Sequence, residues 1–376
     1  MLYHLLAPLG RTYILFNLFN YISFRAAGAV VTALLIAFYF GPLIVRKLTE
    51  LKVGQVVRTG LLATHEVKRG TPTMGGLIIL LATVVPTLLW APLTNRFVLV
   101  AIFATLWTGA IGFVDDYLKV VQGKPRGLVA RWKLAGQCSF GIALGLYLWL
   151  QPLVPETTLP ATATVLPFVK YTVLLFTLPV LYIGFVTFVV TGSSNAVNMA
   201  DGLDGLAAGL TAIAAGAFAF FAYIFGRVDM TSYLNFYYLP GAGELTVFCA
   251  ALMGGAIGFL WFNAHPAQVF MGDTGALAIG GGLGTVAILL RAEFLLVIIG
   301  GVFVAEQFSV ILQLGVYKWF KRTRGREYAD AHRVFRMAPL HHHFEKKGWA
   351  ETQVVVRFWI VGLLCALVAF ATLKIR

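Results

Sequence analysis

Charged residues are scarce in this chain: Asp, Glu, Lys and Arg make up only 12% of its 376 residues. Soluble domains carry about twice that fraction, so the 59% hydrophobic content and the mean hydropathy of +0.83 exclude an ordinary soluble protein. The three cysteines lie in apolar runs without metal-ligand spacing, which indicates small core residues. A basic start followed by a small-residue cleavage site is also missing, which predicts no removable signal peptide.

Long apolar runs take the place of the missing charges. A helix that crosses a bilayer core needs about 20 apolar residues, and the predicted spans lie near 22–45, 74–91, 97–114, 134–152, 171–190, 205–226, 243–262, 275–290, 294–317 and 355–373. The eighth is short and contains GGGLG at 280–284, which predicts close packing against its neighbours. No repeat, low-complexity tract or soluble domain interrupts them. We therefore predict one all-α integral membrane domain over residues 1–376, a bundle of ten transmembrane helices.

Lys and Arg are unequally divided between the two sets of connections. The connections 46–73, 115–133, 191–204, 263–274 and 318–354 hold 20 of the 29, whereas the alternate connections and the termini hold 7. The positive-inside rule places the first set in the cytoplasm and both termini in the periplasm, so five cytoplasmic loops could converge on one active site. Because the bases behind the net charge of +13 are scattered between apolar spans, we expect contact with membrane lipid or phosphate and no nucleic acid.

The cytoplasmic loops also carry acids, which topology alone does not require. Asp115 and Asp116 follow GAIGFV directly, and Lys119 and Lys133 come soon after them. Asp273 is an isolated carboxylate at the start of the eighth span. Paired acids beside bases are typical of a site that handles Mg²⁺ and phosphates. The alternative is an interfacial acid pair that the same bases neutralise.

The stretch NAVNMADGLDGL, residues 195–206, combines two amides with two carboxylates and has no base nearby. These side chains are Asn195, Asn198, Asp201 and Asp204. The pattern lacks the acids and the terminal Glu of an EF-hand calcium loop. A glycine-rich turn with Asp204 as the N-cap of the sixth span would explain one carboxylate but leaves the other oxygens without a partner.

Two other loops offer groups suited to a nucleotide. KRGTPTMGG, residues 68–76, places Lys68 and Thr73 at a helix N-terminus, where a phosphate could bind. A helix cap with a positive-inside lysine also explains that segment, and it is the favoured interpretation on this segment alone. In the fourth loop, Asn263 supplies an amide, and Phe270 could stack on a base or lie at the membrane interface.

The most basic loop contains His341, His342 and His343. Three consecutive histidines cannot easily face one tetrahedral ion, so a zinc site is weakly supported. Imidazoles beside a diphosphate are the better interpretation. Glu306 lies within the ninth span, where a carboxylate has either a functional or a packing role.

Five motifs together resemble one known family. GTPTMGG, GFVDDYLK, NAVNMADGLDGLA, FNAHPAQVFMGDTG and MAPLHHHFEKKGW occur in this order between spans, as in bacterial phospho-N-acetylmuramoyl-pentapeptide transferases. The acid motifs are shared with the wider polyprenyl-phosphate hexose-1-phosphate transferases, whereas PLHHHFE is similar to the muramoyl-pentapeptide branch. The resemblance extends from about Phe24 to the C-terminus. One departure is the stretch from Lys321 to His332, which is longer than the family's usual connection.

The resemblance implies a homodimeric enzyme of the bacterial cytoplasmic (inner) membrane, with ten spans, a cytoplasmic site and dependence on Mg²⁺. Family members transfer phospho-N-acetylmuramoyl-pentapeptide from its UDP nucleotide to undecaprenyl phosphate, which releases UMP and forms lipid I for peptidoglycan. Asp273 would be the principal Mg²⁺ ligand, and Asp115 and Asp116 would lie beside it at the catalytic centre, with Asp115 as the candidate base. The histidine triplet would line the same cavity. The residues implied for substrate binding are Lys68, Thr73, Lys119, Lys133, Asn195, Asn198, Asp201, Gly202, Leu203, Asp204, Asn263 and Phe270.

Two other functions fit part of this pattern. A sibling transferase that uses UDP-N-acetylglucosamine would share the acid motifs. A nucleotide-sugar transporter is less favoured, because transporters place ionisable groups near the bilayer midplane and here only Glu306 is deep. Within the transferase, direct attack by the lipid phosphate and a covalent aspartyl intermediate both remain open. Direct attack is favoured because a phosphate is already a nucleophile.

Overall fold

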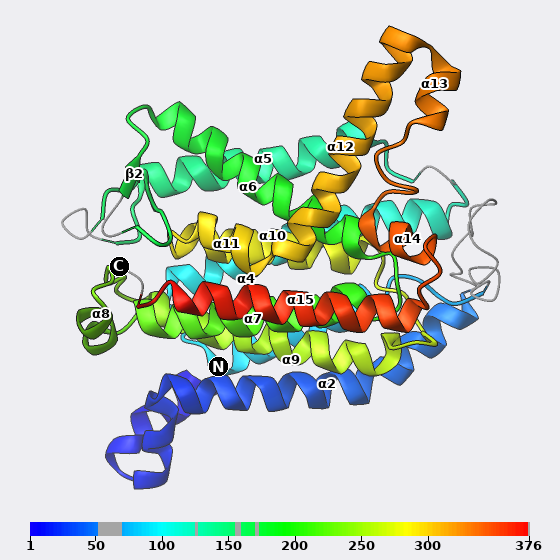
Figure 1. Cartoon of the computed structure of the whole chain (residues 1–376). Helices are drawn as coiled ribbons and strands as arrows, with labels where there is room; N and C mark the ends of the chain where they lie inside the picture. Colours follow the sequence, from blue (N-terminus) through cyan, green and yellow to red (C-terminus); the bar gives the residue numbers. More distant parts are fainter. Residues whose placement is uncertain (52–69, 125–126, 155–158, 170–172, 375–376) are drawn as a thin grey trace.

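The computed structural model describes residues 1–51, 70–124, 127–154, 159–169 and 173–374. Long helices lie side by side with their axes roughly parallel, and short helices and loops close the two ends of the bundle (Figure 1). The helices are α1 (Leu2–Leu6), α2 (Ile22–Glu50), α3 (Gly76–Trp90), α4 (Arg96–Val120), α5 (Ala130–Leu150), α6 (Pro179–Ala200), α7 (Leu206–Phe225), α8 (Val228–Leu234), α9 (Leu245–Asn263), α10 (Gly272–Leu289), α11 (Glu293–Ile299), α12 (Gly301–Arg324), α13 (Arg326–Ala331), α14 (Leu340–Glu345) and α15 (Glu351–Ala371). Shorter 3₁₀ turns cover Pro8–Arg11, Ile14–Asn20 and Ala242–Glu244.

Each of the ten predicted spans corresponds to a helix or to a bent pair of helices. By length and composition, seven helices of the described residues can cross a membrane, or eight if the pair α11 and α12 forms one span. The helix α3 is apolar but has only 15 residues. The chain is therefore a multi-pass membrane protein built mainly of helices, and the count of ten stays a prediction.

The fifth predicted span is displaced along the chain. The run 171–190 was expected to be helical, but α6 begins at Pro179 and continues to Ala200. Proline favours the first turn of a helix because its missing N–H needs no partner there. Residues Val173–Leu175 form the strand β2, which pairs antiparallel with β1 (Ala163–Val165). The prediction of an all-α fold is therefore wrong at this hairpin, and residues 191–200 belong to a helix instead of a loop.

The helix α10 lies at the centre of the bundle and is buried along almost its whole length. Its glycines allow neighbouring helices to approach: a Cβ at Gly280 would lie 2.4 Å from the carbonyl oxygen of Ser193, on α6. A Cβ at Gly281 would lie 2.4 Å from the hydroxyl of Thr108, on α4. The predicted close packing of the GGGLG segment is confirmed.

The predicted ninth span is broken at Gly300. The axes of α11 and α12 differ by 87° there. Beyond this bend α12 leaves the bundle, and its end stands apart from the other long helices together with α13 (Figure 1). The helix α14, which carries the three histidines, packs against α12 and α15.

Candidate active site

Three aspartates from two helices meet at one end of the bundle. Asp115 and Asp116 lie one turn before the end of α4, which extends six residues beyond the predicted span. Asp273 lies in the first turn of α10. Their carboxylate oxygens lie within 4.8 Å of one another. Gly112 makes this meeting possible, because a Cβ there would lie 2.1 Å from the carbonyl oxygen of Asp273. The side chains of Asp115 and Asp116 are almost fully buried.

Asp116 acts as a cap for α10 from the neighbouring helix. Its Oδ2 accepts hydrogen bonds from the Thr274 N–H at 2.9 Å and from the Thr274 hydroxyl at 2.7 Å. Its Oδ1 accepts the N–H of Asp273 at 3.2 Å. Gly272, at a φ of +72°, makes the sharp turn into α10, where a Cβ would lie 2.7 Å from Asp116 Oδ2. Asp116 thus satisfies free N–H groups of the helix start and fixes the position of Asp273.

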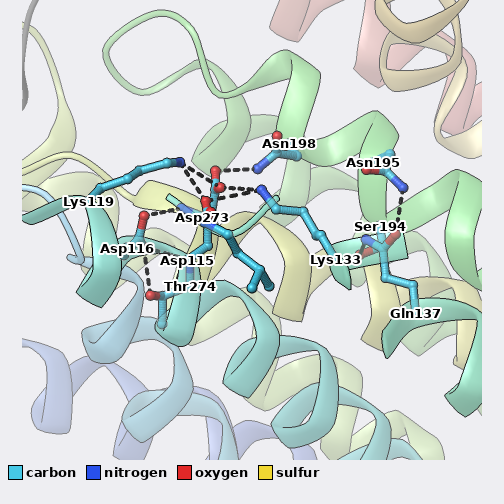
Figure 2. A network of polar contacts seen from close by, with 11 residues as sticks. Asp115, Asp116, Lys119, Lys133, Gln137, Ser194, Asn195, Asn198, Asp273 and Thr274 are labelled. Atoms are coloured by element: carbon cyan, nitrogen blue, oxygen red, sulfur yellow. Dashed lines mark hydrogen bonds and ion pairs between the residues drawn. The ribbon is translucent and has the colours of Figure 1, made fainter. Parts of the chain in front are cut away.

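Two lysines neutralise the other two carboxylates (Figure 2). The Lys119 Nζ lies 2.5 Å from Asp115 Oδ2 and 2.9 Å from Asp273 Oδ2. The Lys133 Nζ, from α5, lies 3.1 Å and 2.6 Å from the same two oxygens. Lys119 reaches Asp115 because residues four apart lie on one helix face. The Asn198 amide, from the last turn of α6, donates to Asp273 Oδ1 at 2.7 Å.

The donor set of this cluster suits a hard divalent cation. Carboxylate oxygens are the ligands that Mg²⁺ prefers, and Mg²⁺ sites commonly use one or two carboxylates together with substrate phosphates. The three carboxylates face two ammonium groups, which leaves one negative charge uncompensated if all five groups are ionised. The residues Asp115, Asp116 and Asp273 therefore fit the metal role that was predicted for them.

Comparison with known proteins gives a consistent result. Residues 98–291 match the glycosyl transferase family 4 model, and residues 68–80 match signature 1 of phospho-N-acetylmuramoyl-pentapeptide-transferase. Proteins of the latter name from Gemmatimonas aurantiaca, a Geobacter species and Citrifermentans bemidjiense are 60%, 51% and 50% identical to the chain, and each alignment covers 100% of both sequences. The chain belongs to the phospho-N-acetylmuramoyl-pentapeptide-transferase family. It is thus a transferase.

In this transferase, the turn after α6 is held by groups from two other segments. The Asp204 Oδ2 accepts the N–H of Ala267 at 3.2 Å and lies 3.1 Å from His265 Nδ1. The N–H of Asp204 donates to Glu351 Oε1 at 2.9 Å. Asp204 is therefore not the side-chain N-cap of α7 that the alternative interpretation required; Gly205 occupies that position. Asp204, His265 and Glu351 form a second group with metal-ligand spacing among the described residues.

Asn263 ties the same turn to the segment that follows α9. Its Oδ1 accepts the N–H of Gly205 at 3.0 Å, and its Nδ2 donates to the carbonyl of Val269 at 2.9 Å. The amide of Asn263 thus has structural partners on both atoms. Leu203 is buried in this turn, and Phe270 is half-buried.

Asp201 lies at the junction of this turn and the aspartate cluster. Burial raises the pKa of the Asp201 carboxyl to about 8, with further contributions from the charges of Asp273 and Asp116. The N–H of Gly272 partly offsets that effect by donating to it. The carboxyl is thus largely protonated at neutral pH and can donate a hydrogen bond as well as accept one.

His341 joins the fifth loop to this region. Its Nε2 would lie 2.3 Å from a Cβ at Gly202, so the ring packs directly on that glycine. Glu306 Oε1 accepts the N–H of His341 at 3.2 Å, and Glu306 Oε2 lies 3.2 Å from His341 Nδ1. Both side chains are fully buried. Glu306, the deep carboxylate of the ninth span, therefore holds the backbone of His341 in place and lies close to its ring.

The other two histidines have separate partners. The Nδ1 of His342 lies 2.7 Å from Glu345 Oε2, and the Nδ1 of His343 accepts the N–H of Arg336 at 3.1 Å. Burial lowers the pKa of His343, and the positive charges of Lys347 and Arg336 lower it further. Because the three Nδ1 atoms face three different partners, the triplet does not converge on one ion in this conformation.

The remaining predicted residues differ in how close they come to the cluster. Thr73 is buried, and its hydroxyl would lie 2.9 Å from a Cβ at Gly272. Asn195 points away from Asp273 and donates to Gln137 Oε1 at 2.9 Å, in a separate group of side-chain hydrogen bonds between α5 and α6 (Figure 2). Lys68 lies outside the described residues.

Three contributors to the site were not predicted from the sequence. The N–H of Leu128 donates to Asp115 Oδ1 at 2.6 Å, which covers one face of that carboxylate. Gln137 and Glu351 position the two ends of the 195–206 stretch. Glu351 had no specific signal in the sequence, because an acid in the first turn of a helix is common there. A backbone N–H has no such signal either.

Proposed function

We propose that the protein transfers phospho-N-acetylmuramoyl-pentapeptide from its UDP nucleotide to undecaprenyl phosphate, which yields lipid I and UMP. The names of the relatives supply the transferred group. The observation that carries the proposal is the meeting of Asp115, Asp116 and Asp273 with Lys119 and Lys133. The reaction brings a lipid phosphate against a diphosphate, so a site that holds cations and ammonium groups is what the chemistry requires.

In this reaction, an oxygen of the lipid phosphate forms a bond to the phosphorus that carries the sugar. The bond from that phosphorus to the UMP oxygen breaks, and UMP leaves. A phosphate monoester has a second pKa of about 6, so Asp115 needs only to accept a residual proton or orient the attacking oxygen. Lys119 and Lys133, which contact Asp115 and Asp273 here, would move to the substrate phosphates when these bind.

Asp115, Asp116 and Asp273 would hold Mg²⁺, with Asp273 as the principal ligand. When bound, the ion supplies Lewis-acid neutralisation of the phosphate oxygens. Asp116 contributes a second function, because its contacts with the start of α10 keep the Asp273 carboxylate in place. Lys119 and Lys133 would contact the phosphates, and Asn198 would keep Asp273 oriented.

The turn formed by Asp201, Gly202, Leu203 and Asp204 would receive the nucleoside. Its backbone is fixed by Asn263 and Glu351, so the polar groups of the turn are ordered before substrate arrives. Phe270 would stack on the uracil, Thr73 and Lys68 would contact the phosphates, and the histidine triplet would line the same cavity.

A coupled assay tests the reaction and the site together. The purified full chain is given UDP-N-acetylmuramoyl-pentapeptide and undecaprenyl phosphate with and without Mg²⁺, and UMP and the lipid product are measured. We expect turnover only with Mg²⁺, and a loss of at least about a hundredfold in Asp273→Asn. The control Asp229→Asn removes an exposed acid on α8 and should leave turnover unchanged. Normal Mg²⁺-dependent turnover in Asp273→Asn would refute the site, and lipid product formed only from UDP-N-acetylglucosamine would refute the donor.

We also propose that the chain lies in the bacterial inner membrane with ten spans, a cytoplasmic site and periplasmic termini, and that it forms a homodimer. The charge distribution of the connections supports the orientation, and the family resemblance supports the dimer. The mass of the protein in lipid nanodiscs would measure the assembly, and a single chain per particle at all concentrations would contradict it.

A further inference from the structure

The distal half of α12 has no protein partner on most of its surface. The buried residues of this helix are Val302, Phe303, Glu306 and Ser309, all in its first three turns. From residue 310 to its end no side chain of α12 is buried. In Figure 1 this part of the helix rises away from the bundle and ends beside α13. This part of the helix is therefore open to membrane lipid.

One face of this segment changes character along the helix axis. Ile311 and Leu314 are 56% and 52% exposed, and they lie on the same face as Lys318 because they are spaced by three or four residues. The same face continues to Lys321 and Arg322. An apolar stripe thus becomes a basic stripe within about 15 Å of helix. Trp319, at the boundary, is 59% exposed.

This order matches the depth profile of a bilayer leaflet. Apolar side chains suit the hydrocarbon, tryptophan is enriched at the interface, and lysine and arginine suit the headgroup layer. The 87° bend turns α12 away from α11, so that its distal end lies apart from the other long helices (Figure 1). The bases at its end would therefore meet lipid headgroups.

The bases are also available for a ligand. The segment Lys318–Arg336 contains seven Lys and Arg residues and two acids. Asp330 already pairs with Arg326 at 3.7 Å and Arg333 at 3.0 Å. Within the described part of the chain, Lys318, Lys321 and Arg322 have no acidic side chain within ion-pair distance.

The segment is held in shape by its own contacts. The guanidinium of Arg324 donates to the Tyr328 hydroxyl at 2.5 Å, and the Tyr328 ring packs edge-on against Phe320. The N–H of Phe335 donates to Gln313 Oε1 at 3.0 Å, which ties the returning chain to α12. The basic face is thus presented on a rigid support.

We propose that α12 and α13 form an arm that binds the phosphate headgroups of anionic membrane lipids, with Lys318, Lys321 and Arg322 as the ligands. This binding site is separate from the aspartate cluster, and it gives a role to the stretch that departs from the usual connection of the family. Charge complementarity and the apolar-to-basic stripe favour a lipid over a soluble acidic partner, which would need no hydrocarbon contact.

The test compares lipid selectivity in nanodiscs that contain the full-length protein. Discs are made from phosphatidylcholine with and without about a quarter of phosphatidylglycerol, whose negative charge attracts Lys and Arg, and the enrichment of phosphatidylglycerol around the protein is measured. In the triple variant Lys318→Gln, Lys321→Gln and Arg322→Gln, we expect the phosphatidylglycerol fraction beside the protein to fall to about that of the bulk disc. Higher salt should reduce the enrichment in the wild type, because exposed charges are screened.

A matched control removes the same charge from the other end of the bundle. Arg11→Gln, Arg96→Gln and Lys374→Gln change three exposed bases and should leave the enrichment near the wild-type value. Equal loss in both triple variants, or unchanged enrichment in the arm variant, would overturn the proposal. So would a shift from two chains to one per disc in the arm variant alone, because that would identify a second copy as the partner.

Folding of the arm variant is checked separately. The triple variant Lys318→Arg, Lys321→Arg and Arg322→Lys conserves the charge and should retain phosphatidylglycerol. Turnover of the glutamine variant in phosphatidylcholine alone should equal that of the wild type. If the charge-conserving variant also loses enrichment, headgroup electrostatics is not the cause and the proposal fails.

Discussion

At the scale of single residues, two lysines occupy the positions for which a divalent cation would compete. The Lys133 Nζ contacts Asp273 Oδ2 at 2.6 Å and Asp115 Oδ2 at 3.1 Å. Removing this charge in Lys133→Gln leaves the two carboxylates more negative. We therefore expect Mg²⁺ to bind on the order of tenfold more tightly in calorimetric titration without substrates. Turnover should fall, because the phosphates lose an ammonium partner.

The control for this prediction lies on the same helix. Arg131→Gln removes an equal charge two residues away, from an exposed side chain, and should change Mg²⁺ affinity little because exposed charges are screened. Weaker or unchanged Mg²⁺ binding in Lys133→Gln would show that the lysine does not compete with the ion.

The raised pKa of Asp201 predicts that the free energy of unfolding depends on pH. This pKa is about 8 in the folded protein, against an ordinary value of 3.8. Between these values the folded protein keeps a proton that the unfolded chain has lost, so the free energy of unfolding decreases as pH rises through that window. The Asp201→Asn variant cannot ionise and should lose this part of the slope. Thermal unfolding of metal-free protein from pH 5 to 9 measures it, with Asp229→Asn as the exposed control. An unchanged slope in Asp201→Asn contradicts the assignment.

Much of the site was predictable from residue types, but the roles within it were not. Paired acids, an isolated Asp273 and nearby lysines are rare enough between apolar runs to identify a cluster. Asp116 caps α10, whereas Asp115 contacts the lysines. This difference depends on how α4 and α10 pack, and it cannot be read from two adjacent residues in a sequence. For the same reason the sequence does not show that Asn195, one turn from Asn198, donates to Gln137 while Asn198 donates to Asp273.

At the scale of elements, the site depends on the close packing of α4 against α10. In Gly112→Ala, the new Cβ would lie 2.1 Å from the carbonyl oxygen of Asp273, and backbone cannot yield as a flexible side chain does. We expect a destabilisation of about 1–3 kcal/mol and a loss of transferase turnover, because the three carboxylates are separated. Thermal unfolding and the UMP assay measure the two effects.

Gly184→Ala provides the matched control on α6. No atom lies within 4 Å of a Cβ built there, and the residue is in a helix. This substitution should be neutral or stabilising by up to about 1 kcal/mol, since alanine is the better helix former. If Gly112→Ala behaved like Gly184→Ala, the approach of α4 to α10 would not be limited by this glycine.

Hydropathy located the helices well and their ends less well. The apolar residues 173–175 satisfied the same criterion as a span, yet they form a strand that pairs with Ala163–Val165, and the helix begins only at Pro179. The polar ends of α4 and α6 stayed helical beyond the predicted spans, since helix formation needs no apolar side chain. The bend at Gly300 was not visible, because both arms of the broken span are apolar.

At the scale of the whole molecule, the proposed chemistry lies at one end of the bundle. The ends of α4 and α6 and the start of α10 all contribute to that end, whereas the chain termini lie toward the other (Figure 1). Lys119 and Lys133, from the second basic connection, lie at the same end, against the aspartate cluster. A lipid phosphate could then reach the carboxylates while its tail stays between helices, which is the advantage of placing this transfer at a membrane face.

This arrangement predicts which residues a membrane-impermeant maleimide reaches in intact cells. A cysteine at Lys124, in the exposed loop beside Asp115, should react only after the inner membrane is permeabilised. A cysteine at Asp229, exposed on α8 at the other end, should react at once when the outer membrane alone is opened. Cysteines at Leu5 and Lys374 should both behave like the Asp229 variant, because ten spans place the two termini on the same side. Reaction of the Lys124 variant in unpermeabilised cells would invert the orientation, and opposite behaviour of the two termini would require an odd number of spans.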